Sequence, residues 1–153
     1  MSRMRKVCGW LALVPFGLMH LAVGLALAED QSAAAYIRSF YPPDDPKAPQ
    51  ARYTPRTAKL WDECFARADA NGDACMDFDM FVQGNDFDLS DIEVEQLSGN
   101  AEHAVVRARF KNFGKDETVI FELIHDDQGW VIDEITSGCN VLTEHLQGKS
   151  TCM

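Results

Sequence analysis

The sequence lacks the short motifs by which many enzymes are recognised. It contains no G-x-S-x-G nucleophile turn, no H-E-x-x-H zinc motif and no glycine-rich loop that cradles phosphate. It also contains no C-x-x-C pair, which argues against a zinc site and against thioredoxin-like redox chemistry. These absences favour a binding or interaction domain over an enzyme, and we expect no cofactor.

Basic residues are also few. The chain has 14 Lys and Arg residues and 24 Asp and Glu residues, which gives a formal net charge of −10. Three of the basic residues, Arg3, Arg5 and Lys6, lie together before an apolar run at 7–28. The run ends in a small-x-small triplet at 26–28, directly before acidic sequence. This order of basic, apolar and small residues is typical of a cleaved secretory signal peptide.

An uncleaved membrane anchor is the alternative interpretation of this segment. The run of 22 residues is long enough, since about 20 apolar residues span a bilayer. Pro15 and three internal glycines weaken it as a permanent span. We therefore expect a signal peptide at 1–28, cleavage near Ala28, and a single periplasmic or secreted domain at 29–153 without stable membrane insertion.

The domain expected at 29–153 is strongly acidic. Loss of the signal leaves 11 basic residues against 24 acidic ones, a formal net charge of about −13. Such a surface repels nucleic acid and anionic lipid, so a partner attracted by charge is a cationic protein. Solubility alone is the competing explanation of the charge.

Four cysteines follow the signal: Cys64, Cys75, Cys139 and Cys152. An even number in an exported domain indicates two disulfides, for which three connectivities exist. We expect the local pair Cys64–Cys75, across a helix end and a turn. We expect the second pair, Cys139–Cys152, across a short C-terminal helix.

Helical signals dominate the first half of the domain. The segment 31–41 has apolar residues on one helical face and is stopped by two prolines. A second helix is expected over 55–70, because Thr54 offers an N-cap oxygen and Pro55 suits the first helical position. Gly72 ends that pattern.

After residue 87 the apolar period changes to roughly two, which predicts strands. Turn residues at 98–100, 114–116 and 127–129 separate these strands at hairpin spacing. A last short helix is expected over 141–148. Helices followed by consecutive strands predict an α+β fold, with the helices packed on an antiparallel meander sheet of about four strands.

The segment 69–81 contains a partial calcium-loop pattern. Four residues occupy positions 1, 3, 5 and 9 of such a loop: Asp69, Asn71, Asp73 and Asp77. However, Ala74 stands where the loop needs glycine, and Met80 stands where it needs a bidentate glutamate. An acidic turn held by a disulfide is therefore favoured over a metal site.

A family resemblance is carried by two stretches, MDFDMFVQGNDFDLSDIEV at 76–94 and HAVVRARFKNFGKDETVIFELIHDDQGWVIDEI at 103–135. They contain a D-x-D-x-F segment leading to Asn85-Asp86, a strand of alternating small apolar residues and a closing G-W-x-I-D-x-I. In these features the chain resembles, over about 33–146, a bacterial family of exported domains of unknown function. The fold of that family is similar to nuclear transport factor 2, also named cystatin-like.

The resemblance implies a cone in which a curved sheet and its helices enclose an apolar pocket, the default place for a ligand. The ligand-binding candidates are Asp79, Asn85, Asp86, Trp130 and Asp133. The expected function is a non-catalytic module for a small apolar ligand or a cationic protein. The alternative is an acid–base enzyme of the isomerase or dehydratase type, for which His103 and His125 join the carboxylates as candidates. Trp61 is expected to pack in the core or at its rim.

Overall fold

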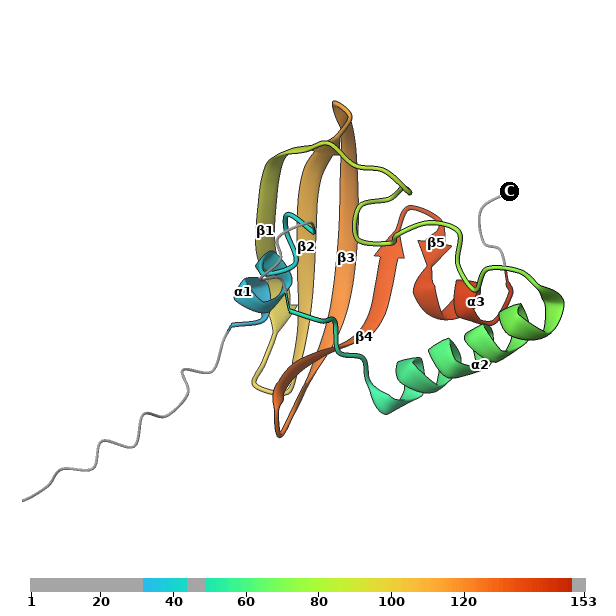
Figure 1. The fold of residues 1–153 in the computed structure, drawn as a ribbon. Helices are drawn as coiled ribbons and strands as arrows, with labels where there is room; N and C mark the ends of the chain where they lie inside the picture. The colour runs from blue at the N-terminus through green and yellow to red at the C-terminus, as the bar shows by residue number, and fades with distance from the viewer. Residues whose placement is uncertain (1–31, 44–48, 150–153) are drawn as a thin grey trace, which may run out of the picture.

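Five antiparallel strands in sequential order form the central sheet of the protein, which a computed structural model describes over residues 32–43 and 49–149 (Figure 1). The strands are β1 (Leu89–Gly99), β2 (His103–Asn112), β3 (Lys115–Asp126), β4 (Gly129–Ser137) and β5 (Asn140–Val141). The helices are α1 (Ala33–Arg38), α2 (Pro55–Asn71) and α3 (Leu142–Leu146). The predicted α+β class is confirmed, and the short β5 adds a fifth strand to the four that were expected.

Some of the sequence predictions fall on residues outside the described ranges. These are the signal peptide at 1–28 and Cys152, so the pair Cys139–Cys152 stays a prediction. Within the described ranges, no helix is both long enough and apolar enough to cross a membrane.

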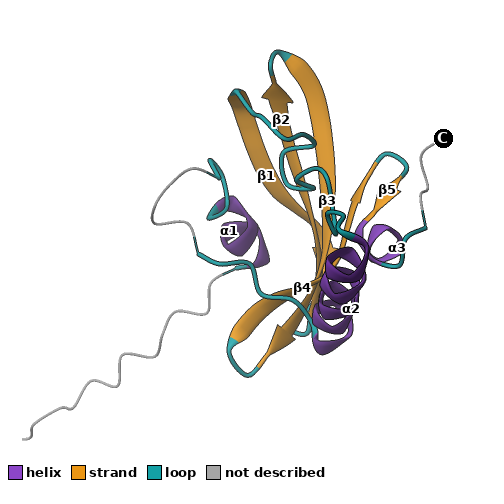
Figure 2. Ribbon diagram, turned by 45° about the vertical axis from the view of Figure 1, so that its right-hand side comes forward, coloured by secondary structure: helices purple, strands orange, loops and turns teal. Residues whose placement is uncertain are grey.

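The helices lie at two places on the sheet. α1 packs against β1 and β2, whereas α2 and α3 lie together beside β4 (Figure 2). The chain that leads into α2 runs along β4 as a short parallel bridge. There Thr54 N donates to the Ile132 carbonyl over 2.9 Å, and Ile132 N donates to the Arg52 carbonyl over 2.8 Å. This bridge sets where α2 begins relative to the sheet.

α2 begins and ends where its capping residues predict. The Thr54 side chain accepts a hydrogen bond from Thr57 N at 3.3 Å, and Pro55 stands in the first turn. At the other end Gly72 has a φ of 73°, a left-handed conformation that glycine adopts without Cβ strain. The helix buries a face that includes Cys64.

α1 is shorter than the helix predicted over 31–41. The Ser39 hydroxyl donates to the Tyr36 carbonyl at 2.6 Å where the helix ends. A residue that precedes proline disfavours helical dihedrals, which ends the helix ahead of Tyr41-Pro42. Tyr41 is nevertheless buried in the core.

One face of the sheet forms the core. Along β2, alternate residues from Ala104 to Phe110 are buried, as the period of two predicts. β2 pairs with β3 without a break in register, so Val106 lies opposite Phe121. The largest fully buried side chains include Phe121, Ile37, Leu123, Ile132, Ile135, Leu142 and Leu146.

β4 departs from strict alternation at Asp133. Its pairing register with β3 shifts between Ile132 and Glu134, which leaves Asp133 as an extra residue, a β-bulge. Because of this insertion, Ile132 and Ile135 both face the core although they are three residues apart.

The turn between β2 and β3 lies one residue earlier than the predicted 114–116. Phe113 and Gly114 form it, with φ of 49° and 77°. Lys115 already pairs with Asn112 in the sheet. Two successive residues at positive φ characterise the type I′ hairpin turn, whose twist suits antiparallel strands. The prediction was wrong here because Phe113 has no turn propensity of its own.

Candidate functional site

An open hollow lies between α2, the segment 73–85 that follows it, β4 and α3. Its volume is about 700 Å³, a size usual for ligand pockets. Five aromatic side chains line it, and we name it the aromatic hollow after them: Tyr53, Trp61, Phe65, Phe78 and Phe81. Ile135 and Leu142 contribute apolar surface from β4 and α3.

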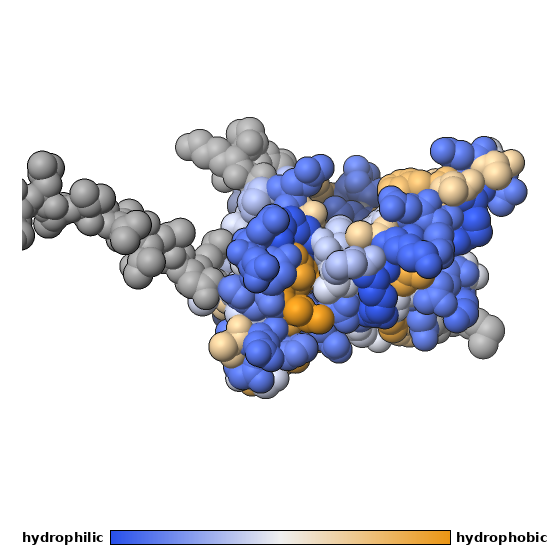
Figure 3. All heavy atoms as spheres, turned by 90° about the horizontal axis from the view of Figure 1, so that it is seen from below, coloured by the Kyte–Doolittle hydropathy of each residue, from blue (hydrophilic) through white to orange (hydrophobic). Residues whose placement is uncertain are grey.

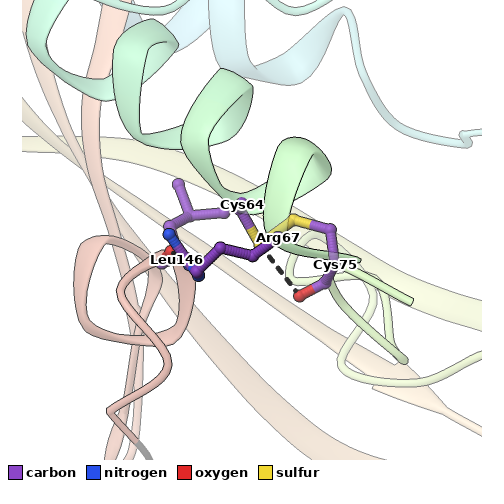
Figure 4. The surroundings of a disulfide bond; sticks show 4 residues. All are labelled: Cys64, Arg67, Cys75 and Leu146. Carbon is purple, nitrogen blue, oxygen red and sulfur yellow. Dashed lines mark hydrogen bonds between the residues drawn. A yellow bond between two sulfur atoms is a disulfide. The ribbon is translucent and has the colours of Figure 1, made fainter. Parts of the chain in front are cut away.

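The disulfide between Cys64 and Cys75 holds the start of segment 73–85 against α2, and it confirms the predicted pairing (Figure 4). The two Cα atoms are 5.3 Å apart. Cys64 Sγ also lies 3.2 Å from the Cys75 carbonyl oxygen, which is a contact only, since a disulfide sulfur has no hydrogen to donate. Beside it, the Arg67 guanidinium donates to the Leu146 carbonyl and ties α2 to α3.

A tight turn places Asp79 at the hollow. Asp79 N donates to the Gly84 carbonyl at 3.1 Å, and Gly84 N donates back to the Asp79 carbonyl at 3.3 Å. The Asp79 carboxylate accepts a hydrogen bond from Phe81 N at 2.7 Å. The Asn112 side-chain amide donates to the Val82 carbonyl at 3.0 Å, which anchors the turn to the sheet.

The aromatic rings from α2 and its approach lie against one another. Trp61 and Phe65 stack with centroids 5.5 Å apart and an interplanar angle of 23°. The Tyr53 ring lies 5.9 Å from Trp61. Phe65 stays 54% exposed, so part of this stack is open to solvent.

Trp61 Nε1 is a buried donor without an acceptor. Among the described residues it is the one buried side-chain nitrogen or oxygen atom that forms no hydrogen bond. The Tyr53 hydroxyl is its nearest polar neighbour in effect, because the Trp61 side chain acts to lower the pKa of that hydroxyl, yet the two groups do not form a hydrogen bond of normal geometry. An unsatisfied buried donor costs about 1–3 kcal/mol, and a ligand that supplies an acceptor would remove this cost.

Burial keeps the Tyr53 hydroxyl protonated. It raises the pKa of Tyr53 to about 12, and the nearby Asp79 and Tyr36 act in the same direction. The pKa of Asp79 is also raised, by desolvation, and the hydrogen bond from Phe81 N opposes the rise. More than a third of the Asp79 surface is nevertheless open to solvent, which screens its charge.

Carboxylates form an acidic rim around the hollow: Asp69, Asp73, Asp77 and Asp79. All four are exposed. Across residues 32–43 and 49–149, none of them forms an ion pair with Lys or Arg. Acidic residues of β1, by contrast, are paired with basic residues of β2. The acidic rim therefore has no counter-charge from the described chain. Figure 3 shows one face of the molecule, which is mostly hydrophilic with smaller hydrophobic patches.

The calcium-loop candidates fall at two cavities. Asp69, Asp73 and Asp77 line the aromatic hollow, whereas Asn71 lines a smaller cavity beside Cys64. In the part of the chain that the structure describes, no three His, Cys, Asp or Glu side chains are grouped so as to hold a metal ion.

Asp133 connects the start of α2 to β4, away from the hollow. Its carboxylate accepts hydrogen bonds from the Thr54 hydroxyl at 2.7 Å and from the Arg56 guanidinium at 2.9 Å. Partial burial acts to raise the pKa of Asp133, but these hydrogen bonds and the positive charges of Arg56 and His103 outweigh it, so the pKa is lowered. Asp133 and His103 line a second cavity of about 270 Å³.

The remaining candidates divide between the hollow and other places. Asn85 lines the hollow. Asp86 is exposed and does not line it. Trp130 is buried elsewhere and packs edge-on against His125, with centroids 4.8 Å apart. Of the five ligand-binding candidates, the structure brings Asp79 and Asn85 together at the hollow.

Sequence reasoning missed most of the aromatic lining. Trp61 and Phe65 stand one helical turn apart on a half-exposed face, which is a signal that the sequence did carry. Tyr53 had no such signal, because it reaches the hollow only through the bridge to β4. Phe78 and Phe81 reach it through the turn at Asp79.

Comparison of the chain with protein-family models, with curated proteins and with solved structures gives no match.

Proposed function

We propose that this protein is a non-catalytic binding module that holds its ligand in the aromatic hollow. The observation that carries the proposal is the open cavity of about 700 Å³ with the buried, unsatisfied Trp61 Nε1. A concave, largely apolar surface with a few polar groups is the usual form of a ligand site. The resemblance to exported cystatin-like domains agrees with a cone that encloses a pocket.

The chemistry of the hollow favours binding over acid–base catalysis. A general base needs a positioned group whose pKa lies near the working pH. Tyr53 has a pKa of about 12 and stays protonated. The Asp79 carboxylate is exposed and engaged by Phe81 N. His103 and His125 lie at other places.

One observation keeps the acid–base enzyme as the second candidate. Asp79 and Tyr53 line the same hollow, and burial raises the pKa of both. A protonated Tyr beside a carboxylate can donate to a carbonyl oxygen while the carboxylate removes a proton. A screen of carbonyl substrates that finds turnover abolished equally by Tyr53→Phe and Asp79→Asn would replace the binding proposal with this one.

We also propose that the domain works in the periplasm or outside the cell. The confirmed Cys64–Cys75 disulfide supports this, because disulfides persist mainly in oxidising compartments. Secretion of the expressed full chain with residue 29 at its new N-terminus tests it, and recovery of the intact chain in the cytoplasm would contradict it.

An NMR screen of fragments tests the binding proposal. The protein is labelled with ¹⁵N, and neutral, cationic and anionic fragments are added at about 1 mM, the range of weak first contacts. We expect at least one class to shift the Trp61 indole N–H and the amides of 73–85, while the Trp130 indole N–H stays in place. Shifts that cluster instead around Asp133 and His103 would move the site to the second cavity.

A further inference from the structure

The charge and the hydrogen-bonding groups of the aromatic hollow define its occupant more narrowly. We infer that the aromatic hollow binds an arginine side chain presented by a polypeptide. The guanidinium lies at the acidic rim, and a main-chain carbonyl of the polypeptide accepts a hydrogen bond from Trp61 Nε1. This inference rests on the proposed binding function and names the ligand for the same site.

The acidic rim selects a cation. Asp69, Asp73 and Asp77 are exposed, and within the described residues their carboxylates form neither ion pairs nor hydrogen bonds. No contact of these kinds within the described residues therefore competes with a ligand for them. Negative charges that line a concave surface raise the local concentration of positively charged ligands. An anionic ligand would be repelled by the same groups.

The aromatic stack selects arginine among cations. Trp61 and Phe65 offer stacked ring faces beside the rim, and Phe65 is 54% exposed. A planar, weakly hydrated guanidinium stacks on aromatic faces and still donates several hydrogen bonds to carboxylates in its plane. A lysine ammonium is a compact and strongly hydrated charge, so it gains less from this combination.

The Trp61 indole requires a second feature of the ligand. The Trp61 side chain lines the hollow, and its buried Nε1 forms no hydrogen bond among the described residues. A neutral carbonyl satisfies it, whereas a carboxylate would bring negative charge next to the acidic rim. An arginine within a peptide carries both the cation and the neutral acceptor. A simple metal ion lacks the neutral acceptor, and a purely apolar ligand lacks both the cation and the acceptor.

The test uses a blocked pentapeptide, acetyl-Gly-Gly-Arg-Gly-Gly-amide, added to the full ¹⁵N-labelled chain. Three matched peptides replace its arginine by citrulline, lysine or glutamate. Citrulline keeps the shape and removes the charge. We expect the arginine peptide to shift the Trp61 indole N–H downfield and to bind at least about tenfold more tightly than the citrulline and glutamate peptides, with lysine between them.

Two double variants separate the rim from the overall charge. Asp73→Asn/Asp77→Asn removes two charges at the hollow. The control, Asp116→Asn/Asp127→Asn, removes two exposed charges near the two ends of β3, outside the lining of the hollow. The first is expected to weaken the arginine peptide about threefold to tenfold and the second by less than about twofold. Neither pair forms a hydrogen bond through its side chains within the described chain, so both variants should fold.

Three results would overturn the inference. They are equal affinity for the arginine and citrulline peptides, equal weakening by the two double variants, and an unshifted Trp61 indole at saturating arginine peptide. If neutral fragments still shift the hollow in any of these cases, the proposed binding function stands and only the ligand is wrong. A salt titration on the unmodified protein gives an independent check, since affinity for the arginine peptide should fall as ionic strength rises.

Discussion

The Thr54 hydroxyl donates a hydrogen bond of 2.7 Å to the Asp133 carboxylate, so the N-cap of α2 is fastened to the bulge of β4. The Thr57 hydroxyl adds a second link, to the Asp133 carbonyl, at 2.6 Å. These bonds set the direction in which α2 leaves the sheet, and Trp61 and Phe65 follow on that helix. Asp133 therefore positions the aromatic hollow without lining it.

Loss of the Asp133 carboxylate should destabilise the fold. We expect Asp133→Ala to lower the free energy of unfolding by about 1–2 kcal/mol, because Thr54 loses a buried acceptor. Arg56 is exposed, so its ion pair adds little. Asp133→Asn keeps an acceptor and should cost less than half as much. Urea unfolding measures both, and equal losses would show that the charge, not the hydrogen bond, is what matters.

The same contact should make stability depend on acid pH. The pKa of Asp133 is lowered from its ordinary 3.8. Its contribution to stability is therefore present above that ordinary value and is lost as the pH falls through the lowered one. The difference in stability between the unmodified protein and Asp133→Asn should be full at about pH 6 and should shrink as the pH falls below the ordinary value of 3.8 and through the lowered one. A difference that stays constant over this series would contradict the assignment.

All three tyrosines of the chain should resist ionisation. Burial raises the pKa of Tyr36, Tyr41 and Tyr53 above 10.0. In an ultraviolet titration, the native protein should show clearly less tyrosinate at about pH 10.5 than the urea-unfolded chain, which should be more than half ionised there. Since the folded pKa values are raised, their stabilising effect is complete below pH 10 and is lost as the pH rises further. Half-ionisation of the native protein near pH 10 would contradict the burial.

The Cys64–Cys75 disulfide should order the segment that closes the hollow. Cys64→Ala/Cys75→Ala is expected to lower the free energy of unfolding by about 2–4 kcal/mol. Amide hydrogen exchange should accelerate in 73–85 and stay unchanged in β2, because β2 is held by the sheet. A loss of unfolding free energy below about 0.5 kcal/mol, with unchanged exchange at 73–85, would show that the turn at Asp79 is enough to order this segment without the disulfide.

The local signals of the sequence predicted the elements well. Thr54, Pro55 and Gly72 act at the ends of α2 through bonds and dihedrals that span a few residues, so their effect is visible without the fold. The same holds for the strand order and for the Cys64–Cys75 pair, whose partners lie 11 residues apart. The position of the hairpin turn at Phe113 was predicted wrongly, because the conformation of this turn is set by the pairing of two strands.

The site depended on contacts that no local pattern encodes. Tyr53 reaches the hollow through a bridge to Ile132, a partner 79 residues away. Asp133 leaves the alternation of β4 because the register to β3 shifts there. Asp79 and Asn85 were identified from the family resemblance, but the aromatic side chains around them come together only in three dimensions.

The central claim is that the aromatic hollow is the binding site, and the fragment screen on two phenylalanine variants tests it most directly. Phe65 lines the hollow and is 54% exposed, whereas Phe113 is 66% exposed at the turn between β2 and β3. Fragments that shift the Trp61 indole N–H in the unmodified protein should bind at least about threefold more weakly to Phe65→Ala and unchanged to Phe113→Ala. Equal weakening in both variants, or no fragment that shifts the Trp61 indole at all, would contradict the claim.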